Sequence, residues 1–150
     1  TRERIRDVSP ESFEILATDI SHSVLETAKA GKYDDVSISR GLDLEYRSRY
    51  FSREGKTWVL DKGIRDRVEF KQFNLQNNFV ALGRFDAVFC RYVTIYFSPD
   101  LKREIFRKIA GALNRPCGVL FLGNSEVYTQ YGDYFTRKLH SGGVYYKVKE

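Results

Sequence analysis

The sequence predicts an α/β fold with a mainly parallel β-sheet. Short apolar runs typical of buried strands alternate with helical segments, and this rhythm is typical of a sheet with helices on both faces. The chain of 150 residues has the size of one domain. Its 42% hydrophobic residues, with eleven Phe and ten Tyr, exclude a disordered chain and suffice for a packed core.

The first strand and helix are expected near the start of the chain. Phe13–Thr18 is an apolar run that predicts a buried strand ending at Asp19. The segment Ser23-Val-Leu-Glu26 has the spacing of a capping box, so a helix is expected to begin there. Gly31 is a suitable stop for that helix.

The next segment, residues 32–67, interrupts this alternation. Polar and aromatic residues alternate through it, including Tyr50-Phe51 and Thr57-Trp58. Gly55 between them suits a tight turn, so a small antiparallel β-subdomain is predicted as an insertion.

The remaining elements return to the α/β pattern. Strands are expected at residues 68–73, 85–90 and 118–123, and a closing antiparallel hairpin at 134–139 and 144–148. Between the second and third of these lies the clearest helix, with Ser98 as N-cap and Pro99 in the first helical position. Its apolar face is predicted from a four-residue repeat of Leu101, Ile105, Ile109 and Leu113.

Several classes of function find little support. No apolar run approaches the roughly 20 residues that cross a bilayer, so a cytoplasmic protein without membrane insertion is expected. The net charge of +5 is spread through mixed segments, which argues against nucleic acid as a partner. Cys90 and Cys117 are expected to be buried, reduced thiols, and with His22 and His140 they form no metal-binding pattern. Neither histidine is expected to be catalytic.

Two polar residues lie just beyond predicted strands, where ligands bind in open α/β sheets. Asp19 could accept hydrogen bonds from a ribose diol, or it could simply cap the following helix. Asn74 could offer its amide to an adenine edge, or it could be a turn residue.

The stretch Arg91-Tyr-Val-Thr-Ile-Tyr96 is the most unusual in the chain. An arginine that follows a buried strand can hold a carboxylate through two parallel hydrogen bonds. Tyr96 could present its hydroxyl to the same cleft, or it could be a core aromatic beneath the next helix. These two residues are the candidate catalytic groups.

The sequence resembles the CheR-type chemotaxis receptor methyltransferases through four motifs in the expected order. The resemblance runs from about Phe13 to the end of the chain. The motifs are Ile15-Leu-Ala-Thr-Asp-Ile20, Phe73-Asn-Leu75, Phe85-Asp-Ala-Val-Phe-Cys-Arg91 with Ile95-Tyr-Phe97, and Leu120-Phe-Leu-Gly-Asn-Ser-Glu126.

This resemblance implies a class I methyltransferase, Rossmann-like fold that uses S-adenosyl-L-methionine and releases S-adenosyl-L-homocysteine. It implies that Asp19 holds the ribose and that Asn74 and Leu75 border the adenosine. It also implies that Arg91 and Tyr96 stand near the transferred methyl group, with backbone contacts to the cofactor at Tyr92.

The resemblance further implies a reaction and a partner. Glutamate side chains of methyl-accepting chemotaxis receptors would be converted to methyl esters. In some members of the family, the counterpart of residues 32–67 docks the C-terminal peptide of a receptor.

The chain departs from the family pattern at two places. The family usually has Asn where this chain has Tyr92, and no match to its glycine-rich G-x-[ST]-x-G-E-E loop is present. We therefore expect residues 1–150 to be the C-terminal part of the methyltransferase domain. The first strand, its glycine-rich loop and an N-terminal helical domain would lie outside them.

Two alternatives stay open from sequence alone. The chain could belong to an S-adenosylmethionine-dependent methyltransferase that acts on a small molecule or on RNA. It could also be a non-catalytic binding module that has kept the fold.

Overall fold

A computed structural model describes residues 9–126 and 133–149, which have a mixed α/β structure. The chain divides into two compact units, Thr1–Asn74 and Leu75–Glu150. Each unit contains one parallel pair of strands and one antiparallel arrangement. The mixture of helices and strands expected from the sequence is therefore confirmed.

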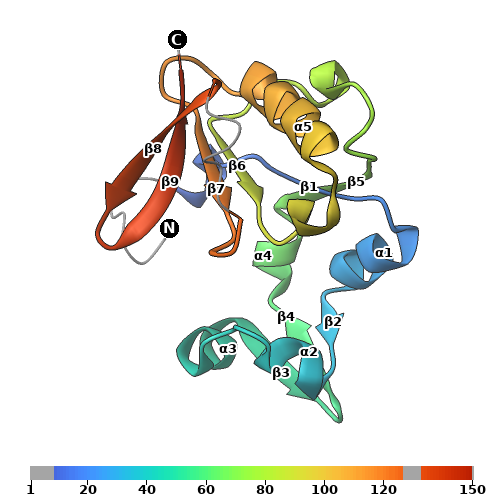
Figure 1. Ribbon diagram of the computed structural model, residues 1–150. Coiled ribbons are helices and arrows are strands. Elements are labelled where there is room, and N and C mark those ends of the chain that lie inside the picture. Colours follow the sequence, from blue (N-terminus) through green and yellow to red (C-terminus); the bar gives the residue numbers. More distant parts are fainter. Residues whose placement is uncertain (1–8, 127–132, 150) are drawn as a thin grey trace. The chain divides into compact units, whose positions relative to one another are not determined.

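The first unit begins with a short 3-10 helix and a parallel strand pair. Strand β1 follows the helix, and β5 runs beside it, with Ile15 opposite Val68 and Asp19 opposite Gln72 (Figure 1). Helix α1 comes directly after β1, as the sequence predicts. The bounds are η1 (Pro10–Ser12), β1 (Ile15–Asp19), α1 (His22–Ala30) and β5 (Val68–Gln72).

Helix α1 begins two residues earlier than the capping-box pattern predicts. Ser21 is the N-cap, because its backbone is extended and its hydroxyl accepts a hydrogen bond from the Val24 N–H. Ser23 lies inside the first turn, so its prediction as the cap was wrong. The stop at Gly31 is confirmed, with a left-handed φ of 63° that suits glycine.

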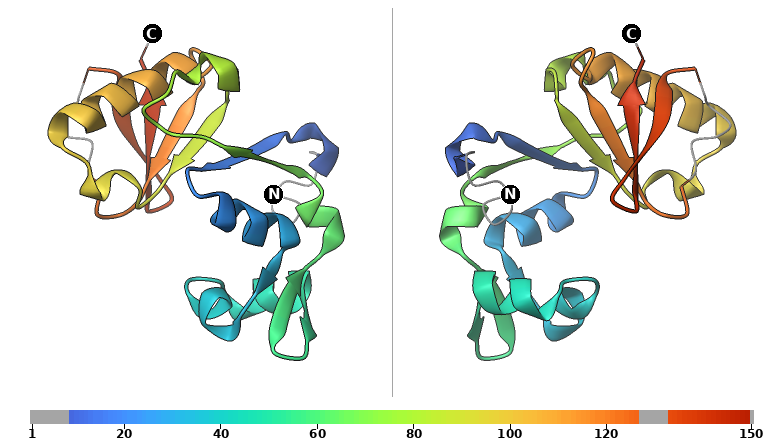
Figure 2. Two further views of the ribbon diagram at one scale, coloured as in Figure 1. Left: turned by 90° about the vertical axis from the view of Figure 1, so that its right-hand side faces the viewer. Right: turned by 90° about the vertical axis from the view of Figure 1, so that its left-hand side faces the viewer.

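The insertion at residues 32–67 contains the predicted hairpin and more helix than expected. Its three antiparallel strands have the order β2-β4-β3, and Gly55 forms the turn between β3 and β4 with a φ of 61° (Figure 2). Three short helices were not predicted. The bounds are β2 (Lys32–Tyr33), α2 (Asp35–Ser39), α3 (Leu44–Tyr50), β3 (Phe51–Glu54), β4 (Thr57–Leu60) and α4 (Lys62–Arg65).

The side chain of Trp58 organises one side of this insertion. Its indole N–H donates to the Asp35 carboxylate at 2.6 Å. The guanidinium carbons of Arg47 and Arg53 lie 4.7 Å and 5.3 Å from the centre of the indole ring. These cation–π contacts tie α3 and β3 to β4.

The second unit is built on a four-stranded sheet in the order β6-β7-β9-β8 (Figure 1). β6 and β7 are parallel, whereas β7-β9 and β9-β8 are antiparallel. The sheet of this unit is mixed, because the predicted closing hairpin supplies half of its strands. The bounds are β6 (Ala87–Cys90), β7 (Val119–Leu122), β8 (Phe135–His140) and β9 (Gly143–Val148).

Helix α5 (Pro99–Ala112) covers one face of this sheet (Figure 2). Its N-terminus is as predicted, because Ser98 accepts from the Leu101 N–H and Pro99 occupies the first turn. Ile105 and Ile109 are 0% and 2% exposed and form the centre of the core. Two 3-10 helices flank the unit's first strand, η2 (Phe79–Leu82) and η3 (Thr94–Tyr96).

The two cysteines have different surroundings. Cys90 at the end of β6 is buried as expected, and burial raises the pKa of its thiol to about 12. Cys117 is exposed, so the expectation of a buried thiol was wrong there. The cause is the start of β7, which begins at Val119 and leaves Cys117 in the preceding turn. Within residues 9–126 and 133–149, no helix is long and apolar enough to cross a bilayer.

Candidate functional site

The carboxyl ends of β1 and β5 bring two predicted site residues together. The Phe73 N–H donates to the Asp19 carbonyl oxygen at 2.9 Å, which continues the β1–β5 pairing one residue past the end of β5. Asn74 follows immediately, and both Asp19 and Asn74 are half-buried. Both polar residues therefore lie at the carboxyl end of the parallel pair, where ligands bind in open α/β sheets.

The Asp19 carboxylate already makes one local hydrogen bond. Its Oδ1 accepts from the Ser21 N–H at 2.8 Å, next to the true N-cap of α1. The second oxygen, Oδ2, can accept from a hydroxyl group of a ligand. A ribose contact through Oδ2 would leave the turn contact through Oδ1 intact, so the two interpretations of Asp19 are compatible.

The loop after β6 exposes the candidate catalytic residues. Arg91 is exposed, and its guanidinium carbon lies 5.4 Å from the centre of the Tyr92 ring. Tyr96, at the end of η3, is 87% exposed, so the alternative of a core aromatic was wrong. Leu75 is half-buried at the start of the second unit. The roles of these residues toward a cofactor stay predictions.

A buried carboxylate lies behind this loop. Glu126 is 8% exposed, and it follows β7 in the last of the four motifs. Among the described residues, Thr94 donates two hydrogen bonds to Oε1 of Glu126, one from its N–H and one from its hydroxyl, both at 2.9 Å. Its Oε2 accepts from the N–H groups of Tyr92 at 2.5 Å and Gly123 at 2.9 Å.

These contacts decide the protonation state of Glu126. Desolvation by burial, the largest influence, raises its pKa, but the hydrogen bonds from Gly123, Tyr92 and Thr94 together lower it below the usual value. The carboxylate is therefore ionised at neutral pH. Sequence reasoning assigned it no role, although its position at the end of a motif after an apolar strand was a usable signal.

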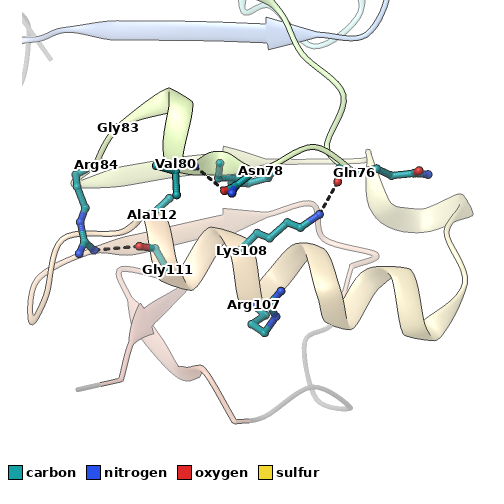
Figure 3. A pocket seen from close by; sticks show the side chains of 10 residues that line it. Gln76, Asn78, Val80, Gly83, Arg84, Arg107, Lys108, Gly111 and Ala112 are labelled. Carbon is teal, nitrogen blue, oxygen red and sulfur yellow. Dashed lines mark hydrogen bonds between the residues drawn. The ribbon is translucent and has the colours of Figure 1, made fainter.

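A separate hollow of about 680 Å³ lies between η2 and α5 (Figure 3). Two of the cations around it donate hydrogen bonds that link separate segments of this unit. Arg84 donates to the carbonyl oxygens of Gly111 and Leu113 at the end of α5, and Lys108 donates to the Gln76 carbonyl oxygen. These bonds satisfy carbonyl groups at a helix end and in a loop. None of the predicted site residues lines this hollow.

The model of the family described as CheR methyltransferase, SAM binding domain, matches residues 1–141. The chain belongs to this family. The resemblance of the four sequence motifs to CheR-type methyltransferases is confirmed by this match.

Curated proteins named as chemotaxis protein methyltransferases are similar to most of the chain. The chain is 45% identical over 137 residues to "Chemotaxis protein methyltransferase 1" of Pseudomonas aeruginosa, with 91% of this chain and 50% of the relative covered. It is 43% identical to "Chemotaxis protein methyltransferase Cher2" of Pseudomonas putida, with the same coverage. "Chemotaxis protein methyltransferase" of Vibrio anguillarum is 41% identical over 92% of this chain and 50% of its own length. The chain thus spans about half the length of the curated relatives it matches.

Proposed function

We propose that this CheR-family chain is part of an enzyme that transfers a methyl group from S-adenosyl-L-methionine to glutamate side chains of chemotaxis receptors. The observation that carries the proposal is the exposed pair Arg91 and Tyr96 after β6, in a chain that matches the family over residues 1–141. The names of the relatives support chemotaxis as the context.

The proposed fold of the full-length chain is the class I methyltransferase fold. Among the described strands, β1 pairs with β5 alone and β6 pairs with β7 alone. Each therefore keeps an edge to which another strand can be added. We place the family's first strand and its glycine-rich loop outside residues 1–150, in agreement with the greater length of the relatives.

The proposed cofactor contacts follow from the two strand ends. In the first unit, Asp19 would accept hydrogen bonds from the ribose through Oδ2, and Asn74 would border the adenine. In the second unit, Leu75 would add an apolar contact to the adenosine, and the backbone of Arg91 and Tyr92 would contact the cofactor. The chemistry of these groups fits the nucleoside part of the cofactor.

Methyl transfer to a carboxylate needs little from the protein beyond placement. S-adenosylmethionine supplies a methyl group already activated by a positively charged sulfur. The acceptor glutamate, ionised at neutral pH with a pKa near 4.3, attacks the methyl carbon through one oxygen, and the electron pair of the breaking C–S bond stays on sulfur. No proton moves, so no general base is required.

The residues of the loop after β6 suit this task. Arg91 can hold the acceptor carboxylate through paired hydrogen bonds, and the Tyr96 hydroxyl can donate to one of its oxygens. Their contribution would be orientation of the reacting atoms, which can supply a large part of a rate enhancement. The receptor itself would be held by the insertion at residues 32–67, whose strand β3 lies at a sheet edge.

The test of the proposal is a methylation assay with the full-length protein and isotope-labelled S-adenosylmethionine. Receptor cytoplasmic regions should acquire label, which should be released as methanol at alkaline pH because the product is an ester. Receptors in which the methylated glutamates are replaced by alanine are the control. Label on RNA or on a small molecule instead would favour the other methyltransferases, and cofactor binding without any transfer would favour a non-catalytic module.

A further inference from the structure

We infer that Glu126 is a positioning residue, which holds the loop Arg91–Tyr96 in the conformation that binds S-adenosylmethionine and the acceptor. The inference rests on the proposed function, because it assigns a support to the loop that carries the proposed reacting groups. Each oxygen of Glu126 already accepts two hydrogen bonds from the protein, so we assign the residue a role through its neighbours.

The geometry of the carboxylate carries this inference. Its two oxygens collect hydrogen bonds from two segments far apart in sequence, the loop after β6 and the turn after β7. Oε1 binds Thr94 twice, through N–H and hydroxyl, and Thr94 is 2% exposed. Oε2 joins the Tyr92 N–H to the Gly123 N–H. One side chain thus fixes both ends of the Tyr92–Thr94 turn.

Only an ionised carboxylate of this length fits the arrangement. All of these partners donate, and a carboxylate is a side chain that only accepts. Glutamine would have to direct its NH₂ group at N–H donors on one side. Aspartate, shorter by one methylene group, could reach one of the two segments but not both in the same geometry.

The backbone of Tyr92 needs this support. Its φ of 59° lies in the left-handed region, which is unfavourable for a residue with a bulky side chain. Such conformations persist where the surroundings determine them, and they cluster at functional sites. The hydrogen bond from the Tyr92 N–H to Glu126 is a direct restraint on that conformation.

Gly123 lies against both the Tyr92 ring and the Glu126 carboxylate. A Cβ atom at this position would lie 2.8 Å from two carbons of the Tyr92 ring and 2.9 Å from Oε2 of Glu126. Real Cβ atoms do not approach other atoms so closely, so a side chain here would displace Tyr92 or Glu126. The turn after β7 is therefore shaped to receive both the ring of Tyr92 and the carboxylate.

The experiment compares three variants of the full-length protein, Glu126→Gln, Thr94→Val and the control Glu69→Gln, whose carboxylate is exposed on β5. Affinity for S-adenosylhomocysteine is measured by calorimetry, and folding by circular dichroism. We expect Glu126→Gln to weaken binding by roughly tenfold or more, because several charge-assisted hydrogen bonds are lost together. Thr94→Val keeps the branched shape and loses one bond, so its effect should be smaller. Glu69→Gln should bind as the wild type does.

A second measurement tests the hydrogen bonds of Glu126 directly. The amide protons of Tyr92, Thr94 and Gly123 should shift together in NMR spectra as Glu126 is protonated at acid pH, and this joint shift should vanish in Glu126→Gln. The described residues with a titratable or charged side chain around the carboxylate include Tyr92, whose N–H binds Oε2, and Arg91, whose guanidinium carbon lies over the Tyr92 ring. Cys90, Arg137 and Tyr146 also belong to them. None of these is a carboxyl group, so the acid titration reports Glu126.

The outcomes separate this inference from the proposed function. If Glu126→Gln stays folded and binds S-adenosylhomocysteine like the wild type, the positioning role is overturned. If Glu126→Gln fails to fold, Thr94→Val decides, because unchanged binding in that variant overturns the role as well. If the wild type itself binds no S-adenosylhomocysteine while the three amides still titrate together, the proposed function fails and the contacts of Glu126 stand.

Discussion

At the scale of single residues, the Asp19 carboxylate offers the clearest test of cofactor binding. Its Oδ1 is bonded to the Ser21 N–H, and Oδ2 is proposed to face the ribose. In the full-length protein, Asp19→Ala should weaken S-adenosylhomocysteine binding about tenfold or more, since a hydrogen bond to a charged group is worth about 1.5–3 kcal/mol. Calorimetry measures this. The control is Asp19→Asn, which keeps the contact to Ser21 and should bind with intermediate affinity, and equal affinity of Asp19→Ala and wild type would contradict the role.

Arg91 tests the chemical step rather than cofactor binding. Arg91→Ala should lower kcat about ten- to hundredfold, because the paired hydrogen bonds to the acceptor carboxylate are lost. Lysine should restore little activity, since it lacks the planar fork of the guanidinium group. The initial rate of receptor methylation is the measurement, and Arg115→Ala, at an exposed turn position, is the matched control. A wild-type kcat in Arg91→Ala would contradict a role of Arg91 in the chemical step.

Sequence reasoning reached these two residues because each follows an apolar strand, and strand ends are where ligands bind in such folds. It did not reach Glu126. The partners of that carboxylate are mainly backbone N–H groups, and Tyr92 lies 34 residues away in sequence. The position of Glu126 after an apolar strand was a signal for a site residue, but a contact between a side chain and distant backbone leaves no residue-type pattern. Its partners therefore become visible only when β6 and β7 are seen side by side.

At the scale of elements, the hairpin β3–β4 is the part to test for receptor docking. Along β3, the backbone N–H and C=O groups of successive residues point alternately toward β4 and toward the open edge of the sheet. The Asp61 N–H donates to the Tyr50 carbonyl oxygen at 2.8 Å, so the backbone groups of Tyr50 point toward β4. By that alternation the Arg53 N–H points to the open edge of the sheet. An extended peptide added at this edge would accept from it.

Two substitutions of Arg53 separate this backbone group from the side chain. Arg53→Pro removes the N–H, and edge strands tolerate proline. Arg53→Ala loses the side-chain contacts to Asp35 and Trp58 but keeps the N–H. The affinity of Arg53→Pro for the receptor should therefore be about two- to tenfold lower than that of Arg53→Ala. Affinity of full-length protein for the receptor is measured in both, with S-adenosylhomocysteine binding as the reference. Equal receptor affinities in the two variants would place the peptide elsewhere.

The elements divide into those with strong sequence signals and those without. Helix α5 was predicted with its N-cap, because Ser98, Pro99 and the repeat through Ile105 and Ile109 all indicate the same helix. The helices α2, α3 and α4 were missed, since none exceeds seven residues and none has an apolar face long enough to show a period. Each does begin after an Asp whose side chain caps it, a signal that was available. These N-caps are Asp34, Asp43 and Asp61.

At the scale of the whole molecule, residues 1–150 should bind the cofactor poorly by themselves. The amino-acid part of S-adenosylmethionine is expected to need a glycine-rich loop at a helix N-terminus, and no two glycines of this sequence have G-x-G spacing. Among the described strands, β1 and β6 each have an edge that pairs with no other strand, and such edges favour aggregation. Calorimetry with S-adenosylhomocysteine should therefore detect binding in the full-length protein only. Micromolar binding by monodisperse residues 1–150 would refute this.

The two cysteines differ in exposure, so one of them can be labelled selectively. Thiol-directed reagents attack the thiolate, so Cys90, with its pKa raised to about 12 and its side chain buried, should resist them. Cys117 lies exposed in the turn between α5 and β7. A maleimide dye should therefore attach to folded residues 1–150 at one position, remote in sequence from Arg91 and Asp19. Fluorescence from that position could follow the arrival of a receptor without altering a residue of the proposed site.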